Sequence, residues 1–159
     1  MLYYTDVPGA TQTTNAAAGT ANDCFFLKPG TSRALWLTGV FPEGRGALLS
    51  TISGISYRVE KWTTTASSGG TAITPTPVDP GYQAAQHTAG YSAGTVTSGT
   101  GGPTLLASFG SGATSPGNWM WSDINQSPCL QAGDNKSFDI FNVSGAASLV
   151  FELFTSTAE

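Results

Sequence analysis

The stretch Ile55-Ser-Tyr-Arg-Val-Glu-Lys-Trp62 carries the clearest structural signal in the sequence. Ile55, Tyr57 and Val59 alternate with polar side chains, and a period of two is typical of a β-strand with one face in a core. The alternation stops at the last two residues, where we expect a bulge or the end of the strand. This stretch therefore predicts a half-buried strand.

The same alternation returns near the C-terminus. Phe138 and Ile140 fall on one face of a strand and Asp139 on the other, and residues 149–154 alternate in the same way. Six further strand candidates, separated by turn-rich polar residues, are 24–28, 33–41, 46–52, 70–74, 104–109 and 118–122. This pattern predicts an all-β fold, either a jelly-roll or related β-sandwich of about eight short antiparallel strands or a closed barrel.

Glycine and proline leave almost no room for long helices. The chain has 20 Gly and 9 Pro, and its one helix-compatible octet, 82–89, is expected to form a single turn. Prolines within 74–81 remove sheet donors, so this segment is expected to be a rigid connector rather than a central strand. Residues 90–103 are expected to be a Gly/Thr-rich excursion with a short edge strand at 95–97.

The length of 159 residues corresponds to one domain at roughly 100–200 residues per domain. Residues 7–22 are rich in Ala, Thr and Gly without periodicity, which is typical of an arm that is mobile or lies on a partner. We therefore expect an N-terminal arm at 1–22 and a single β-sandwich domain at 23–159. The start of the chain resembles no secretory signal, so we expect a cytoplasmic product in which Cys24 and Cys129 are buried free thiols.

The charge pattern argues against two classes of partner. Charged residues make up 10% of the chain and the net charge is −4, whereas ordinary domains have about 25% charged residues. The six basic residues are scattered, and nucleic-acid binding needs clustered positive charge. No apolar run approaches the ~20 residues of a membrane span. We therefore expect neither nucleic acid nor membrane as a partner.

The sequence offers little material for catalysis. His87 is the only histidine, which argues against an imidazole-based metal site and against a serine nucleophile with a histidine base. We expect His87 to lie at the surface or to anchor a loop. Asp123, Asp134 and Asp139 could in principle supply paired carboxylates for glycoside hydrolysis, but we expect them in turns or on a solvated strand face. We therefore expect no enzyme activity, no cofactor and no metal.

Asn118-Trp-Met-Trp121 is the sharpest local feature. A period of two puts Trp119 and Trp121 on one face of a strand and Met120 on the other. An open face would form a stacking platform for sugar rings or a hot spot for a protein partner, and a closed face would be core. Because the chain has few aliphatic residues, we favour core or a subunit interface.

The segment Ser67-Ser-Gly-Gly-Thr-Ala-Ile-Thr-Pro-Thr-Pro-Val-Asp-Pro80, followed by Gln83-Ala-Ala85, resembles small capsid decoration (cement) proteins of tailed double-stranded DNA bacteriophages. In those proteins an alternating strand like 55–62 leads into a Gly-Gly-Thr turn, a Pro/Asp-Pro connector and a Gly/Thr-rich stretch. An aromatic strand like 118–121 and two terminal strands like 136–143 and 148–154 complete the order.

The resemblance implies a jelly-roll or related β-sandwich that assembles as a homotrimer on the outside of a capsid, binds the major capsid protein and stabilises the shell. It implies no catalytic residues, and it places a protein made in the host cytoplasm on the exterior of the virion. We expect the contacts to be mainly apolar, drawn from the N-terminal arm and from loops at one end of the sandwich. The candidate interface residues are Leu2, Tyr3, Tyr4, Trp119 and Trp121.

Two other classes of function remain open. The first is a carbohydrate- or receptor-binding β-sandwich, such as the head of a phage fibre, that uses an exposed Trp119 and Trp121. The second is a trimeric head domain of a cell-surface or matrix protein.

Overall fold

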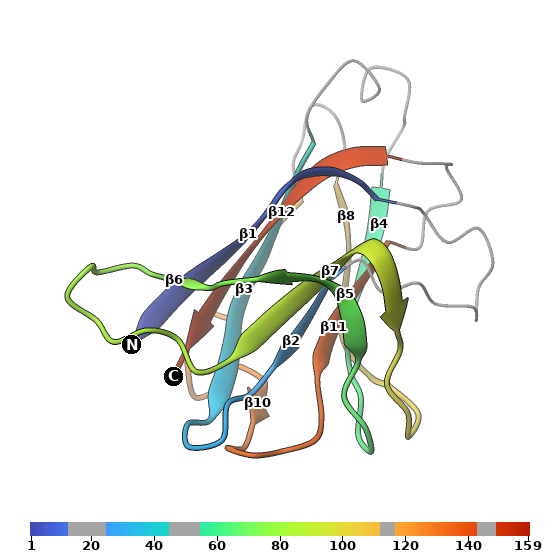
Figure 1. Cartoon of the computed structure of the whole chain (residues 1–159). Coiled ribbons are helices and arrows are strands. Elements are labelled where there is room, and N and C mark those ends of the chain that lie inside the picture. Colours follow the sequence, from blue (N-terminus) through green and yellow to red (C-terminus); the bar gives the residue numbers. More distant parts are fainter. Residues whose placement is uncertain (13–24, 45–54, 112–116, 143–148) are drawn as a thin grey trace.

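The computed structural model describes residues 1–12, 25–44, 55–111, 117–142 and 149–159. Every regular element in these ranges is a β-strand (Figure 1). The strands are β1 (Leu2–Gln12), β2 (Phe25–Lys28), β3 (Leu35–Gly44), β4 (Ile55–Lys61), β5 (Ser68–Ile73), β6 (Thr76–Pro77), β7 (Thr88–Thr97), β8 (Thr104–Ser111), β9 (Trp119–Met120), β10 (Cys129–Leu130), β11 (Phe138–Asn142) and β12 (Leu149–Ala158).

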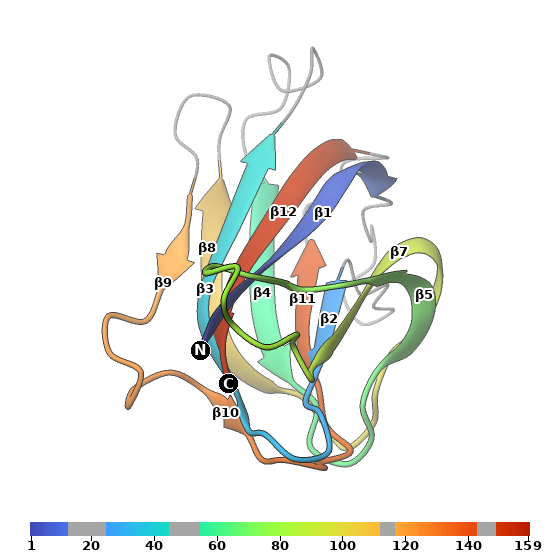
Figure 2. The same cartoon turned by 60° about the vertical axis from the view of Figure 1, so that its left-hand side comes forward.

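The strands form two antiparallel sheets that pack as a β-sandwich. Sheet A has the order β10-β3-β12-β1-β6, with β9 also paired to β3, and sheet B has the order β5-β7-β2-β11-β4-β8. Sheet B curls at its β5–β7 end toward β1 (Figure 2). At that end the chain crosses from β5 in sheet B to β6 in sheet A through Thr74 and Pro75 alone. The all-β sandwich predicted from the sequence is confirmed.

The core lies between the sheets and is richest in large apolar side chains on the sheet B side. Alternate residues of β2, β4 and β11 point into it, and their side chains are fully buried. Sheet A contributes its aliphatic residues from β3 and β10. The largest fully buried side chains are Tyr3, Phe25, Leu27, Leu35, Leu37, Tyr57, Leu130, Phe138 and Ile140.

Several strand predictions agree closely with the structure. The alternating stretch at 55–62 is β4, which ends at Lys61 where the alternation fails, and its Tyr57 and Val59 are fully buried. Phe138 and Ile140 lie in β11 and point into the core. The candidates 24–28, 33–41, 70–74, 104–109 and 118–122 overlap β2, β3, β5, β8 and β9. The candidate 46–52 lies outside the described residues.

The expectation of an N-terminal arm is wrong for residues 2–12. They form β1, which pairs with β12 along its length and with β6 at Tyr3 and Tyr4. The start of β1 is rich in aromatic and β-branched residues, which favour strands. Residues 13–22 of the expected arm lie outside the described residues.

The octet 82–89 is not a helical turn. Residues 83–86 have no regular structure and β7 begins at Thr88, so the expected short edge strand at 95–97 is the end of a ten-residue strand. β7 pairs with β5 on one side and β2 on the other. Tertiary pairing of this kind overrides a weak local helix preference. The connector 74–81 contains only the two-residue edge strand β6, in agreement with its prolines.

Candidate functional surface

The only histidine is buried in a polar network. His87 and Glu159 both have fully buried side chains, and Nδ1 of His87 lies 2.6 Å from Oε1 of Glu159. The Glu159 carboxylate also accepts hydrogen bonds from the backbone N–H groups of Gln86, at 2.9 Å, and His87, at 2.6 Å. Arg33 completes the set, with Nη1 at 3.5 Å from Oε2.

The network holds His87 neutral with its proton on Nδ1. Nδ1–H then donates to Glu159, while Nε2 accepts from the Thr157 hydroxyl at 3.2 Å. Burial lowers the pKa of His87, and the contacts with Glu159 only partly offset this effect. Burial alone would raise the pKa of Glu159, but the hydrogen bonds from Gln86 and His87 bring it below its ordinary value.

This network anchors the loop between β6 and β7 beside the ends of β1 and β12 (Figure 1). The Tyr3 hydroxyl donates to the backbone oxygen of Gln83, and Arg33 donates to the Gln83 side chain. The loop-anchoring role expected for His87 therefore agrees with the structure, and the surface position does not. The ring is fully buried, so it does not present a base to a bound substrate.

Asp139 forms a second buried polar cluster, on the outer side of sheet B. Its carboxylate accepts hydrogen bonds from Trp62 Nε1 at 3.0 Å and from the hydroxyls of Ser67 and Ser137. Ser67 in turn accepts from the backbone N–H of Gly99 at 2.8 Å. Asp139 is fully buried, so the expectation of a solvated strand face is wrong.

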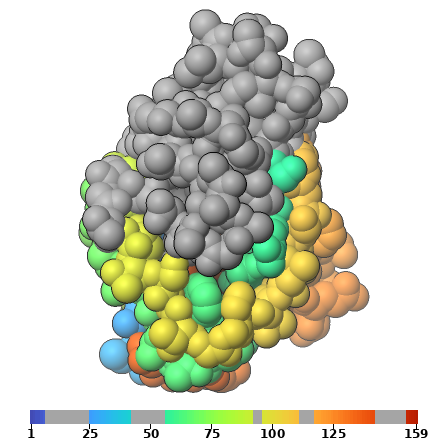
Figure 3. Space-filling view, turned by 90° about the vertical axis from the view of Figure 1, so that its right-hand side faces the viewer, coloured from blue at the N-terminus to red at the C-terminus, as the bar shows by residue number. Residues whose placement is uncertain are grey.

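The Asp139 cluster joins two loops to the sheet. The segments 62–67 and 98–102 lie side by side, with a bridge between Thr65 and Thr100, and both can be followed at the lower end of the molecule in Figure 3. The buried carboxylate provides their common acceptor. The Asp139 cluster has a structural role, because its hydrogen bonds hold backbone segments in place and its carboxylate has no exposed surface.

The other acidic candidates lie in turns. Asp123 Oδ1 accepts from the backbone and side chain of Asn125, and Asp134 Oδ2 lies 3.5 Å from Lys136 Nζ. No group of three or more His, Cys, Asp or Glu side chains within the described ranges is placed to hold a metal ion. Cys129 is a half-buried free thiol, rather than a fully buried one, and burial raises its pKa. Cys24 lies outside the described residues.

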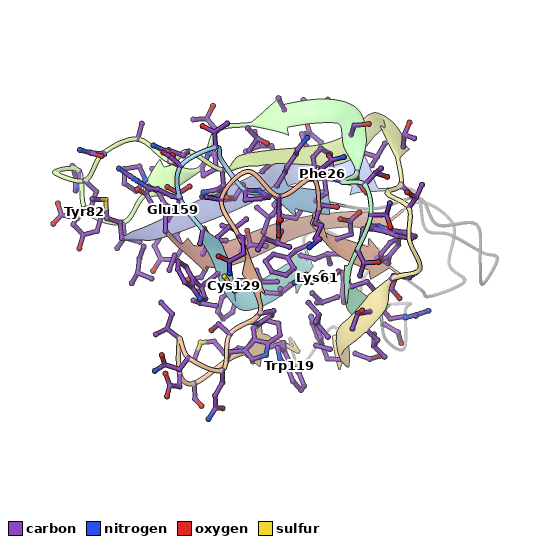
Figure 4. The ribbon with its side chains drawn as sticks, turned by 90° about the horizontal axis from the view of Figure 1, so that it is seen from below. Phe26, Lys61, Tyr82, Trp119, Cys129 and Glu159 are labelled. Carbon is purple, nitrogen blue, oxygen red and sulfur yellow. The ribbon has the colours of Figure 1, made fainter. Side chains whose placement is uncertain are left out.

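Trp119 and Trp121 share one face of the chain, as the sequence pattern predicts. Their ring centroids are 6.1 Å apart in an edge-to-face arrangement. Trp121 packs against the core, whereas Trp119 is 36% exposed at the side of the sandwich (Figure 4). Trp119 stacks on Phe109 at 6.4 Å, and Phe109 stacks on the buried Tyr57 at 5.7 Å. This series of rings connects the β9 edge of sheet A to the β8 edge of sheet B.

The five candidate interface residues do not share one surface. Leu2 and Tyr4 point outward from β1 and are 46% and 38% exposed. Tyr3 points inward and is fully buried, so it offers no surface to a partner. Trp119 and Trp121 lie on the core side of β9, two strands away from β12 in sheet A.

Leu2 and Tyr4 instead belong to a surface that the sequence did not reveal, which we call the outer face of sheet A. Its described side chains are Leu2, Tyr4, Asp6, Trp36, Thr38, Phe41, Thr76, Met120, Cys129, Ser156 and Ala158. Met120 is 65% exposed, the largest exposed fraction among the large hydrophobic residues that the structure describes. The sequence signal for this face is the alternation along β9: Met120 is adjacent to Trp119 and therefore points to the opposite face of the sheet.

Comparison of the chain with protein-family models, with curated proteins and with solved structures gives no significant match. Among the residues that the structure describes, there is no helix long and apolar enough to cross a membrane.

Proposed function

We propose that this chain is a structural protein of a virion, which binds the outer surface of an assembled phage capsid as a homotrimer and stabilises the shell. The sequence resemblance to capsid decoration proteins supports this assignment, and the β-sandwich is the fold class that the resemblance implies. The protein would be made in the host cytoplasm and would act without a cofactor.

One observation carries the proposal furthest. In the described part of the chain three buried titratable groups, His87, Asp139 and Glu159, fix loops, whereas several large apolar side chains are exposed. Met120, Leu105 and Ile124 are 65%, 52% and 48% exposed. Exposed apolar side chains on a surface with few charges favour binding to other proteins rather than chemistry on a small substrate.

Decoration stabilises a shell by mass action. A protein that binds the assembled lattice more tightly than free subunits adds its binding free energy to the lattice. Attachment through three copies raises the effective concentration of each contact, so modest contacts sum to persistent binding. With a net charge of −4 and 10% charged residues, these contacts would be mainly apolar, and binding would depend weakly on salt because screening acts on exposed charges.

The direct test is co-sedimentation with capsids assembled from the major capsid protein that is encoded in the same genome as this chain. We expect saturable binding to assembled shells, little binding to free subunits, and a higher rupture temperature of decorated shells. Occupancy should change less than about twofold between low and high salt. A genome without a capsid protein, or shells that sediment without this chain, would contradict the proposal.

Carbohydrate binding is the second candidate, because Trp119 is 36% exposed and polar residues follow Trp121 in the chain. Stacking on Phe109 covers part of that ring, which favours a packing role. Trp119→Phe keeps an aromatic surface and Trp119→Ala removes it. Glycan-array binding by the wild type and Trp119→Phe that is lost in Trp119→Ala would favour this candidate over decoration.

A further inference from the structure

A cavity of about 410 Å³ opens where the end of β2 meets the start of β7, at the lower end of sheet B (Figure 2). Lys28 and Thr88 are opposite each other in the register of these two strands. The described lining residues are Lys28, Pro29, Gly30, Thr31, Gln86 and Thr88. The cavity shares no described residue with the Trp119 surface or with the Asp139 cluster.

The walls of the cavity are held in place by contacts with the rest of the fold. Gly30 packs directly on Gln86, because a Cβ atom at Gly30 would lie 2.6 Å from Gln86 Cβ and 2.7 Å from its carbonyl oxygen. The backbone N–H of Gln86 donates to Glu159 at 2.9 Å. The carbonyl of Gly30 accepts from Gly133 at 2.8 Å, and the ring of the buried Pro29 fixes its φ angle. A ligand would therefore meet a preformed cavity, which lowers the entropic cost of binding.

The side chains of the lining offer hydrogen-bond donors. Lys28 carries an ammonium group with three donors and no acceptor, and no ion pair joins it to another described residue. Gln86 Oε1 accepts from the Ser32 hydroxyl at 2.5 Å, and its Nε2 group can only donate. The hydroxyls of Thr31 and Thr88 can donate as well. The cavity therefore suits a ligand that is rich in acceptor oxygens.

The charge of the lining indicates the charge of the ligand. Lys28 is the one charged residue among the described lining residues, although the chain has a net charge of −4. The Glu159 carboxylate that binds the Gln86 backbone is fully buried against His87 and does not line the cavity. One lysine matches the single charge of a carboxylate. A phosphate group carries about −1.5 to −2 at pH 7 and would meet more repulsion from the acidic chain.

The size of the cavity indicates a ligand larger than a single ion. Small organic ligands occupy cavities of roughly 300–1,000 Å³, and about 410 Å³ lies in this range. A water molecule occupies about 30 Å³, so an ion as large as a few water molecules would fill only a small part of the cavity. The Thr31 and Thr88 hydroxyls are suited to bind hydroxyl groups of a larger ligand, and Pro29 offers an apolar wall to its C–H groups.

We propose that this cavity binds a small hydroxylated carboxylic acid of the sugar-acid class. Lys28 binds the carboxylate through a charge-assisted hydrogen bond. Thr31 and Thr88 bind hydroxyl groups of the ligand, and the Gln86 amide donates to one of its oxygens. This inference goes beyond the proposed function and does not rest on it, because the cavity lies within one copy of the chain and needs no capsid.

Titration with D-glucuronate tests the inference, with D-glucose, acetate and inorganic phosphate as comparison ligands at constant ionic strength. Backbone amide chemical shifts should move at Lys28, Gly30, Thr31, Gln86 and Thr88, with a dissociation constant in the millimolar range. Glucose lacks the carboxylate and acetate lacks the hydroxyl groups, so each should bind at least about tenfold more weakly than glucuronate. Phosphate should also bind more weakly, because its charge exceeds that of one lysine.

Two substitutions of lysine separate the cavity from the net charge of the chain. Lys28→Met removes the ammonium group but keeps an unbranched side chain, and should weaken glucuronate binding about tenfold or more. Lys136→Met makes the same change in charge at a residue paired with Asp134 outside the lining, and should change binding less than about twofold. Circular dichroism checks that both variants are folded.

Four results would overturn the inference. They are a wild type that does not bind glucuronate at about 20 mM, shifts that move only outside the cavity, acetate or phosphate that binds as tightly as glucuronate, and a folded Lys28→Met that binds like the wild type.

Discussion

Nδ1 of His87 lies 2.6 Å from Oε1 of Glu159, and both side chains are fully buried although 72 positions separate them in the sequence. Glu159 also accepts hydrogen bonds from the backbone of Gln86 and His87. A single buried carboxylate thus fixes the start of β7 against the end of β12. The protonation of this pair should be visible in the pH dependence of stability.

The free energy of unfolding should fall as the pH drops below about 6.5. The pKa of His87 is lowered in the folded state from its ordinary value of 6.5, so the unfolded chain takes up this proton first and acid favours unfolding. Urea denaturation between pH 7 and pH 5 measures the effect. His87→Asn keeps a donor near the position of Nδ1 and should lose this part of the pH dependence.

Glu159 adds a second loss of stability at lower pH. Its pKa is also lowered on folding, from an ordinary value of 4.5, so its contribution is present above pH 4.5 and is lost as the pH falls through the folded pKa. Glu159→Gln should remove that loss while keeping the size of the side chain. A wild type whose unfolding free energy is constant from pH 7 down to about pH 3 would contradict both assignments.

Asp139→Ala should destabilise the domain by roughly 3 kcal/mol, because it leaves the buried donors of Trp62, Ser67 and Ser137 without their acceptor. Asp139→Asn retains one acceptor oxygen and should be less damaging. The exposed Asp6 provides a control, and Asp6→Asn should change stability by less than about 0.5 kcal/mol. Chemical denaturation measures all three variants, and equal losses for Asp139→Ala and Asp6→Asn would contradict the described cluster.

Gly70 and Gly102 form a matched pair for backbone strain. Their φ angles are +68° and +67°, but a Cβ at Gly70 would overlap the carbonyl oxygen of Tyr91, whereas none of the described atoms lies within 4 Å of a Cβ at Gly102. Gly102→Ala should therefore lower the free energy of unfolding by about 1 kcal/mol, because alanine is less stable than glycine in the left-handed conformation. Gly70→Ala should lower it by roughly another 1–3 kcal/mol, because the added Cβ also overlaps a neighbouring atom. Thermal denaturation of the two variants should separate conformational strain from steric overlap.

Removal of residues 1–12 should abolish the folded state. An arm could be deleted without unfolding the domain, but β1 lies between β12 and β6 in sheet A, and its loss would expose both neighbours and the buried Thr155. Near-UV circular dichroism of the truncated chain measures the outcome. A truncated protein with the wild-type spectrum would restore the interpretation of this segment as an arm.

The strands that could be predicted from the sequence are those in which one face is apolar and the other is not. In β4 the buried Tyr57 and Val59 alternate with the exposed Ser56 and Arg58, so the pattern of burial can be read directly. In β1 the buried positions include Thr5 and the exposed positions include Leu2. Polar and apolar residues do not alternate with burial in β1, so the sequence pattern does not distinguish this strand from an arm.

The functional groups were harder to place because their partners come from distant parts of the chain. Asp139 is buried by Trp62 and Ser67, which are 77 and 72 positions away, and no local pattern reports such contacts. The sequence allows His87 the role of a loop anchor but does not indicate Glu159 as its partner. The prediction that Trp119 and Trp121 share one face needs only the period of a strand, and it agrees with the structure.

The stacking of Trp119 on Phe109 joins β9 of sheet A to β8 of sheet B through their side chains. The backbone also crosses between the sheets at this end, because β9 follows β8 in the chain after residues 112–118. At the opposite end of the sandwich, the crossing from β5 to β6 consists of Thr74 and Pro75 alone. The two-residue crossing limits how far the sheets can separate more than the longer one does, so we expect a force that separates the sheets to open the sandwich first beside Trp119, where the fluorescence of that indole reports the opening.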